Sequence, residues 1–186
     1  YTPDLAVPAA PDAIRAFTEL AKQSGVERLV LLSGRGEEEA QNCERIVQDC
    51  GLEWTIVRAS WFNQNFSEGD FLPLVLSGQI TLPVGHVPEP FIDANDIADV
   101  AVAALTESGH AGEVYEVTGP RLMTFEDVAA ELSAATGRRI DFIRVPAEDF
   151  LHASRQAGAS EDVIWLLDYL FSTVLDGRNA QVCDGV

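Results

Sequence analysis

The chain has 186 residues, 47% of them hydrophobic, which is enough for one domain with a sizeable core. Its formal net charge is −18, from 12 basic and 30 acidic residues, and such a surface repels nucleic acid. No apolar run reaches the roughly 18 residues that span a membrane, and no basic-then-apolar signal segment is present. We therefore expect a cytoplasmic protein with neither nucleic acid nor membrane as a partner.

Lysine and cysteine usage gives two further expectations. Lys22 is the only lysine among the 12 basic residues, a bias typical of high-GC bacteria. The three cysteines, Cys43, Cys50 and Cys183, form neither a CxxC pair nor a metal-binding spacing, so no metal site is predicted. We interpret them as small hydrophobic residues in a reducing cytosol.

The first third of the chain has the pattern of a βαβ unit. Residues 11–24 have the apolar spacing of a helix, and the apolar runs 28–32 and 54–57 show no alternation, as in parallel strands buried on both faces. The stretch 36–50 between the two strands has helix length, and residues 37–39 (Glu-Glu-Glu) are expected to open it on a solvated face. This order predicts an α/β fold with a doubly wound parallel sheet.

Shorter elements follow. Thr124-x-x-Asp127 predicts a capping box at the start of a helix that ends before Gly137, and Ser160 predicts the start of the last amphipathic helix. The other expected elements are a helix over 66–76 interrupted near Pro73, strands over 80–82, 113–117 and 140–145, a Pro-rich loop over 83–90, and a helix capped by Asp93 or Asn95 with Ile97, Val100, Ala101, Ala104 and Leu105 facing inward.

Two loops follow the predicted parallel strands, and ligands of open α/β sheets bind beyond the carboxyl ends of strands. The loops are Ser33-Gly34-Arg35-Gly36 and Ala59-Ser60-Trp61-Phe62. Glycines let a ligand approach the backbone closely, Ser33 offers a hydroxyl, and Arg35 offers a cation. A plain turn at the glycines and core packing of Trp61 and Phe62 stay open as alternatives.

Several motifs in order resemble those of the NmrA-like group of atypical short-chain dehydrogenases/reductases. The stretch from the end of the first predicted strand through the second predicted strand is similar to the family's "SGL-x-W/Y-T-I-x-R-P-x-x-F-x-x-N". Later segments are similar to its "F-I/V-D-x-x-D-I-A" and "Y-x-L-T-G-P". The matching residues here are Ser33, Glu44, Cys50-Gly51-Leu52, Trp54-Thr55-Ile56, Arg58, Phe62, Asn65, Pro90-Phe91-Ile92-Asp93, Asp96-Ile97-Ala98 and Tyr115-Glu116-Val117-Thr118-Gly119-Pro120.

The resemblance implies a Rossmann-type sheet that binds NADP or NAD, with a smaller α+β substrate-side region mainly over 63–92 and 120–186. It also implies a single domain that is the C-terminal portion of a longer protein, with about two and a half βαβ units of ~30 residues each in front of Tyr1. The residues it assigns to the cofactor are Tyr1, Pro3, Ser33, Gly34, Arg35, Ala59, Ser60, Trp61 and Phe62. Asn65, His86, Phe91 and Trp165 are expected around a small aromatic substrate.

The expected function is NAD(P)-dependent reduction of a small aromatic or quinone-like acceptor, in specialised metabolism among other settings. One departure bears on mechanism: many dehydrogenases of this superfamily use a Tyr-x-x-x-Lys pair, and this chain has none, so no catalytic acid is identified. A quinone needs less help from an acid, because it is already electrophilic. The alternative is an NAD(P)-sensing regulatory protein without turnover. Homo-oligomerisation stays open, as does the expectation that residues 1–186 alone aggregate because a strand edge is exposed.

Overall fold

The structure, a computed structural model, describes residues 4–183. The described chain forms two compact units. The first unit comprises residues 4–60, 94–118 and Cys183, and the second comprises residues 61–93 and 119–182. Each unit is therefore built from separate segments of the sequence.

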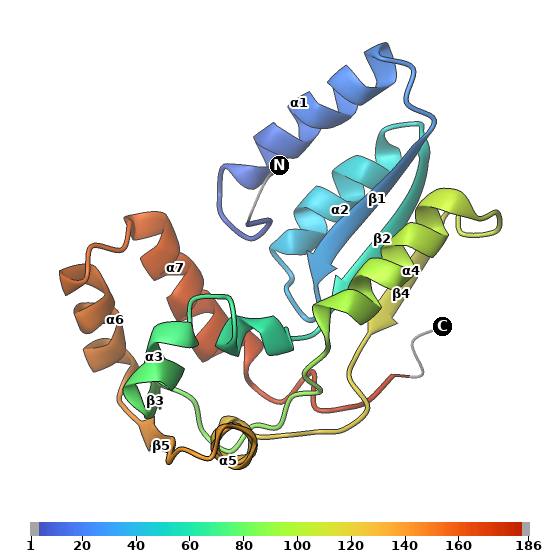
Figure 1. Ribbon diagram of the computed structural model, residues 1–186. Helices are drawn as coiled ribbons and strands as arrows, with labels where there is room; N and C mark the ends of the chain where they lie inside the picture. Colours follow the sequence, from blue (N-terminus) through green and yellow to red (C-terminus); the bar gives the residue numbers. More distant parts are fainter. Residues whose placement is uncertain (1–3, 184–186) are drawn as a thin grey trace. The chain divides into compact units, whose positions relative to one another are not determined.

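A three-stranded parallel sheet forms the centre of the first unit (Figure 1). Its strands are β1 (Arg28–Gly34), β2 (Glu53–Ala59) and β4 (Glu113–Val117), in the order β1-β2-β4. Gly34 is in register with Ala59, and Ala59 with Val117. All three strands consequently end at one level, which we call the carboxyl edge. The α/β, Rossmann-type sheet predicted from the apolar runs is confirmed.

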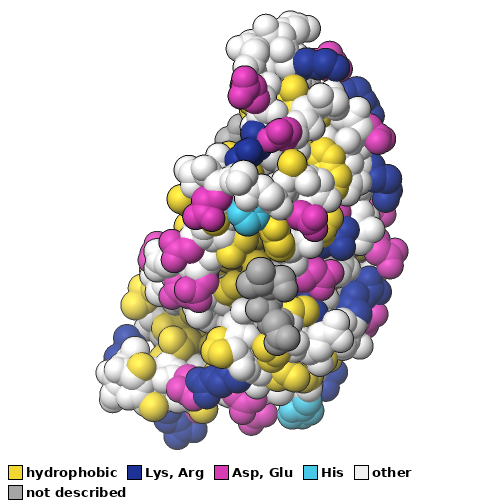
Figure 2. Space-filling model, turned by 90° about the vertical axis from the view of Figure 1, so that its right-hand side faces the viewer, with side chains coloured by type: hydrophobic (Ala, Val, Ile, Leu, Met, Phe, Trp, Pro, Cys, Tyr) yellow, Lys and Arg dark blue, Asp and Glu magenta, His cyan; other side chains and the backbone are white. Residues whose placement is uncertain are grey.

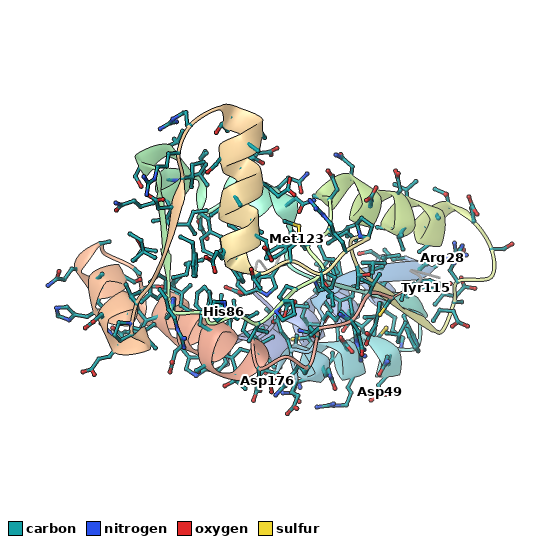
Figure 3. All side chains as sticks on the ribbon, turned by 90° about the horizontal axis from the view of Figure 1, so that it is seen from below. Arg28, Asp49, His86, Tyr115, Met123 and Asp176 are labelled. Atoms are coloured by element: carbon teal, nitrogen blue, oxygen red, sulfur yellow. The ribbon has the colours of Figure 1, made fainter. Side chains whose placement is uncertain are left out.

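Helices cover both faces of this sheet. The helices α1 (Ala10–Gln23) and α2 (Ala40–Asp49) lie on one face, and α4 (Ala94–Thr106) lies on the other (Figure 1, Figure 3). Ile14, Leu29 and Val47 belong to the apolar cluster between the sheet and the first pair of helices. Because both faces are covered, the strands read as continuous apolar runs and not as alternating ones.

Arg28, the first residue of β1, closes the end of α4. Its guanidinium donates hydrogen bonds to the carbonyl oxygens of Ala104 (3.2 Å), Leu105 (3.2 Å) and Glu107 (2.7 Å). The last carbonyls of a helix have no partner within it, and a cation there also opposes the negative end of the helix dipole. A single side chain thus joins the start of the sheet to the end of the helix that covers it.

The second unit is a smaller α+β structure. Its two-stranded parallel sheet pairs β3 (Gln79–Leu82) with β5 (Asp141–Arg144). Its helices are η1 (Asn63–Phe66), α3 (Leu72–Ser77), α5 (Phe125–Thr136), α6 (Ala147–Gln156), α7 (Glu161–Tyr169) and the π-helical turn η2 (Leu170–Val174).

Aromatic rings fill the core of the second unit. The Phe125 ring is fully buried and makes edge contacts with Trp61 (centroids 5.5 Å apart) and Phe91 (5.2 Å). Phe66 and Phe171 join the same cluster. Offset and edge-on ring pairs add about 0.5–1.5 kcal/mol each beyond the apolar area they bury, so this cluster stabilises the unit.

The ends of two helices were predicted correctly from local sequence signals. Thr124 and Asp127 form the predicted capping box at the start of α5, and Gly137 ends that helix with φ +66°. Ser160 caps α7 as predicted, its hydroxyl accepting from the Val163 amide. Both outcomes rest on interactions within a few residues, which sequence patterns describe well.

Other local predictions are wrong for identifiable reasons. Pro73 lies in the first turn of α3, where no amide is needed, so it starts this helix and does not interrupt one. The α2 helix begins at Ala40, after the three glutamates and not with them. Leu105, expected to face inward, is 52% exposed near the end of α4.

The surface reflects the acidic composition. Figure 2 shows Asp and Glu side chains scattered over one face among Arg, Lys and apolar side chains, without a single acidic patch. No helix within residues 4–183 has the length and apolar character needed to cross a bilayer.

Candidate functional site

The carboxyl edge of the first unit brings together the end of β1, the end of β2 and the end of β4. Ser33 and Gly34 end β1, and Ala59 ends β2 in register with Gly34. Ser60 follows, and its backbone amide donates to the Val117 carbonyl of β4 at 3.2 Å. The loops after β1 and β2 therefore start next to each other, since the two strands are neighbours.

A buried ion pair joins α2 to β2 next to the carboxyl edge. The Ser33 hydroxyl donates to Glu44 Oε1 at 2.7 Å, and Glu44 lies on α2. Arg58 of β2 donates two hydrogen bonds to the same carboxylate, from Nε to Oε1 at 3.0 Å and from Nη2 to Oε2 at 2.6 Å. The side chain of Glu44 is 2% exposed. The hydrogen bond to Glu44 raises the pKa of Arg58, so this cation stays charged.

Glu116 of β4 extends this network to Arg35. Its carboxylate lies 3.5 Å from Arg58 Nη1 and accepts from Arg35 Nε at 3.0 Å. The Arg35 side chain is 2% exposed and also donates to Cys183 Sγ at 3.2 Å. Arg35 is therefore held inside the unit by a carboxylate and a thiol, which differs from a cation presented to a ligand.

Glu37 lies in the turn directly after β1. Its carboxyl folds back over Gly34, so closely that a Cβ at Gly34 would lie 1.8 Å from Glu37 Oε1. Burial, followed by the negative charges of Asp4 and Glu44, raises the pKa of Glu37 to about 7. The expectation that this glutamate sits on a solvated helix face is wrong, because the helix starts later and the side chain turns inward.

Ser60 is a buried hydroxyl without a visible partner. The residue is 5% exposed, and its Oγ has no hydrogen-bond partner among the described residues. Leaving a buried hydroxyl unpaired costs roughly 1–3 kcal/mol, so such a group at a ligand-binding edge indicates a place for a polar ligand atom. Among the residues predicted for the cofactor, Ser60 is the one with such an unpaired buried group, whereas the Glu37 carboxyl occupies the space beside Gly34.

Four further residues predicted for the cofactor do not belong to the described part of the first unit. Tyr1 and Pro3 lie outside the described residues. Trp61 and Phe62 belong to the second unit, where the Trp61 ring packs in the aromatic core and Phe62 bridges to Ile92.

The four predicted substrate residues all lie in the second unit but in different surroundings. Phe91 is buried in the aromatic core, and Asn65 is half-buried on η1. His86 is labelled in Figure 3; its side chain is 82% exposed and its Nδ1 lies 3.7 Å from a Glu126 oxygen. Trp165 is 38% exposed and stacks on Tyr169. Their joint role around a substrate stays a prediction.

Sequence reasoning missed Glu37 and Glu116. Glu37 is one of three consecutive glutamates, and nothing in that run distinguishes the one that turns inward. Glu116 gave a usable signal: it is a charged residue within a strand, and such a residue needs a partner when the strand is covered. Among residues 4–183, no group of three His, Cys, Asp or Glu side chains has metal-binding geometry.

The shallow groove between α1 and α2 is a poorer candidate. It is lined mainly by polar and charged residues, among them Arg15, Asn42, Arg45 and Asp49. None of the carboxyl-edge residues lines it, and no side chain there is both buried and unpaired. The chemistry-bearing groups of the first unit therefore lie at the carboxyl edge.

Known proteins resemble this chain in sequence. It is 31% identical over 195 residues to the NAD(P)H azoreductase of Xenophilus azovorans, in a match that covers 96% of this chain and 66% of the azoreductase. The chain thus spans just under two thirds of that relative's length.

Solved structures share the fold. Citrobacter sp. triphenylmethane reductase complexed with NADP(H) matches with a TM-score of 0.77 at 19% identity, over 99% of this chain and 67% of that one. The NADPH-dependent quinone oxidoreductase of Escherichia coli matches with a TM-score of 0.75 at 23% identity, over 92% and 63%. The sequence profile of the NmrA-like family matches residues 38–162. The chain therefore belongs to the NmrA-like family.

Proposed function

We propose that this chain belongs to an NAD(P)-dependent oxidoreductase that reduces a small aromatic or quinone-like acceptor. The observation that carries the proposal is the Ser60 hydroxyl, buried and unpartnered among the described residues at the carboxyl edge of a parallel sheet. Ligands of such sheets bind at this edge. The relatives support the same chemistry, since they include an NAD(P)H azoreductase and an NADPH-dependent quinone oxidoreductase.

The hydroxyl of the edge fits the nicotinamide end of such a cofactor. Ser60 offers a hydroxyl whose hydrogen-bonding capacity is unused within residues 4–183. The sequence contains no G-x-x-G-x-x-G turn, so the fit concerns this end alone. When bound, the reduced nicotinamide supplies a hydride.

The chain's own residues hold the edge rigid. The Glu44–Arg58 pair fixes α2 against β2, and Ser33 is fixed by its bond to the same carboxylate. Preorganised groups of this kind keep donor and acceptor in reacting geometry without reorganisation at the moment of transfer. Ser60 would then orient the ring through one hydrogen bond.

A regulatory protein that binds NAD(P) without turnover is the second candidate. It is favoured by the absence of a Tyr-x-x-x-Lys pair: the Tyr115 hydroxyl is engaged by His110, and the Lys22 ammonium donates to the Cys50 carbonyl. Neither group lies at the carboxyl edge, because Tyr115 is in the middle of β4 and Lys22 is in the last turn of α1, before the start of β1.

Calorimetric titration with NADPH and NADH tests binding, and nucleotide oxidation in the presence of a soluble quinone tests turnover. Ser60→Ala should weaken nucleotide binding about fivefold, the equivalent of one hydrogen bond near 1 kcal/mol. Ser67→Ala, an exposed serine of the second unit, is the matched control and should not change affinity. No binding of either nucleotide would overturn the proposal, and binding without turnover would favour the sensor.

A further inference from the structure

The position of Glu37 places a carboxyl group beside the end of β1. The Glu37 amide donates to the Gly34 carbonyl at 3.4 Å, which closes the turn after the strand. Its side chain then folds back, with Oε1 and Cδ only 1.8 and 2.2 Å from where a Cβ of Gly34 would stand. Glycine at position 34 is therefore what allows this carboxyl to occupy the carboxyl edge.

Two negative charges act on Glu37. Asp4 comes from the segment before α1, and Glu44 comes from α2. The two arginines of the carboxyl edge pair with other carboxylates: Arg58 of β2 binds Glu44 and Glu116, while Arg35 binds Glu116. Burial, and then the two negative neighbours, disfavour the ionised form of Glu37, and its pKa rises to about 7 as a result.

The Glu37 carboxyl is also uncommitted within the described part of the chain. No hydrogen bond or ion pair involving its carboxyl oxygens occurs among residues 4–183, in contrast to Glu44 and Glu116 of the same edge. A carboxyl that holds its proton near neutral pH, beside the end of a parallel strand and without a structural partner, has the properties of a general acid.

Building on the proposed function, we propose that Glu37 is the proton donor for acceptors that need a proton with each hydride. For an azo acceptor, the hydride forms an N–H bond at one nitrogen as the N=N π bond breaks. The Glu37 O–H bond then breaks, and its proton forms the second N–H bond. Water returns a proton to the Glu37 carboxylate, so that one azo group, one reduced nicotinamide and one proton give one hydrazo group and one oxidised nicotinamide.

Two acceptors of different proton demand test this role. A cationic triarylmethyl dye takes a hydride at its central carbon and becomes neutral without a proton, whereas an azo dye needs both. In the full chain supplied with NADPH, Glu37→Gln should slow azo reduction about 100-fold, the lower end of general acid catalysis. Reduction of the cationic dye should change less than about twofold by the same reasoning.

Glu38→Gln is the matched control, because it removes the same charge from the next, exposed residue. It should leave both rates near wild type. Equal losses for the two acceptors in Glu37→Gln, or no loss for either, would overturn the proton-donor role while the oxidoreductase function stands. If the wild type reduces neither acceptor, the proposed function fails and this role falls with it.

A second readout does not depend on turnover. Infrared difference spectra of the nucleotide-free protein should show a carboxyl that loses its proton near pH 7 in the wild type and in Glu38→Gln, and not in Glu37→Gln. Should Glu37→Gln fail to fold, the wild type decides: the ratio of azo to cationic-dye rates must fall as the pH rises through about 7. A ratio independent of pH would overturn the inference.

Discussion

The Ser33 hydroxyl donates a 2.7 Å hydrogen bond to Glu44, and this carboxylate is the buried partner of Arg58. The three groups come from β1, α2 and β2, so they join one helix to two neighbouring strands. Breaking such a pair leaves one charge buried without compensation. The pair should therefore matter more to stability than any exposed ion pair of this chain.

The first prediction concerns this pair. Arg58→Met should lower the free energy of unfolding by about 3 kcal/mol or more, since Glu44 is left buried without its cation. Arg58→Met combined with Glu44→Gln should recover part of the loss, because no charged Glu44 carboxylate then remains buried without a partner. Urea unfolding of the two single variants and the double variant gives the coupling energy. Arg15→Met, at an exposed pair with Asp12, is the control and should cost less than about 1 kcal/mol. Additive losses at Glu44 and Arg58 would contradict the prediction.

Two glycines should respond differently to alanine. At Gly119 an added Cβ would lie 1.8 Å from the backbone oxygen of Phe91, and backbone cannot move aside cheaply. Gly119→Ala should cost about 3 kcal/mol or more. At Gly34 the obstacle is the flexible Glu37 side chain, so Gly34→Ala should cost only about 1 kcal/mol. Thermal and urea unfolding compare the two variants. Gly34→Ala should also push Glu37 towards water, so its pKa should fall back towards 4.5; an unchanged pKa would refute the packing argument.

Stability should depend on pH through Glu37. Its pKa is about 7 in the folded chain against 4.5 for an ordinary glutamate, so the folded state holds this proton more tightly than the unfolded state. The stabilisation is complete below pH 4.5 and is lost as the pH rises through about 7. This one group should contribute a decline of about 3 kcal/mol. Urea unfolding of wild type and Glu37→Gln between pH 4.5 and 8 isolates it, since the difference between the two proteins cancels the other groups. Parallel curves would contradict the assignment.

The capping box of α5 provides a local prediction. Thr124→Ala removes the hydroxyl that accepts from the Asp127 amide and should cost about 1 kcal/mol. Thr136→Ala, at the other end of the same helix, removes an exposed hydroxyl that donates to the Leu132 carbonyl, and alanine's higher helix propensity offsets this loss, so the change should be close to neutral. Chemical unfolding followed by circular dichroism measures both. A loss at Thr136 as large as that at Thr124 would show that the cap has no special role.

Much of the first unit could be predicted from sequence, because its helices and strands are encoded by patterns of a few consecutive residues. The apolar runs of β1 and β2 and the spacing of α1 indicate a parallel sheet with covered faces, and strand register then aligns Gly34 with Ala59. Gly25, with φ +75°, ends α1 for a purely local steric reason. Predictions of this kind depend on a few consecutive residues and succeed for that reason.

The interior charges could not be predicted in the same way. Whether Glu37 faces water or the end of β1 depends on where α2 begins, and three consecutive glutamates give no signal on that point. The link from Arg35 to Glu116 joins residues 81 positions apart, so it exists only once the sheet has formed. Sequence patterns located the carboxyl edge, whereas the contacts that set its electrostatics come from tertiary structure.

The strand order β1-β2-β4 has a consequence for synthesis on the ribosome. Ala59 pairs with Val117, and the chain between them includes residues 61–93 of the second unit. At 5–20 residues per second, translation needs about 3 to 12 s to reach the end of β4 after β2 has been made. During that interval one side of β2 has no strand beside it. Chaperones that bind exposed strand edges should therefore act on the nascent chain in this interval, before β4 pairs with β2.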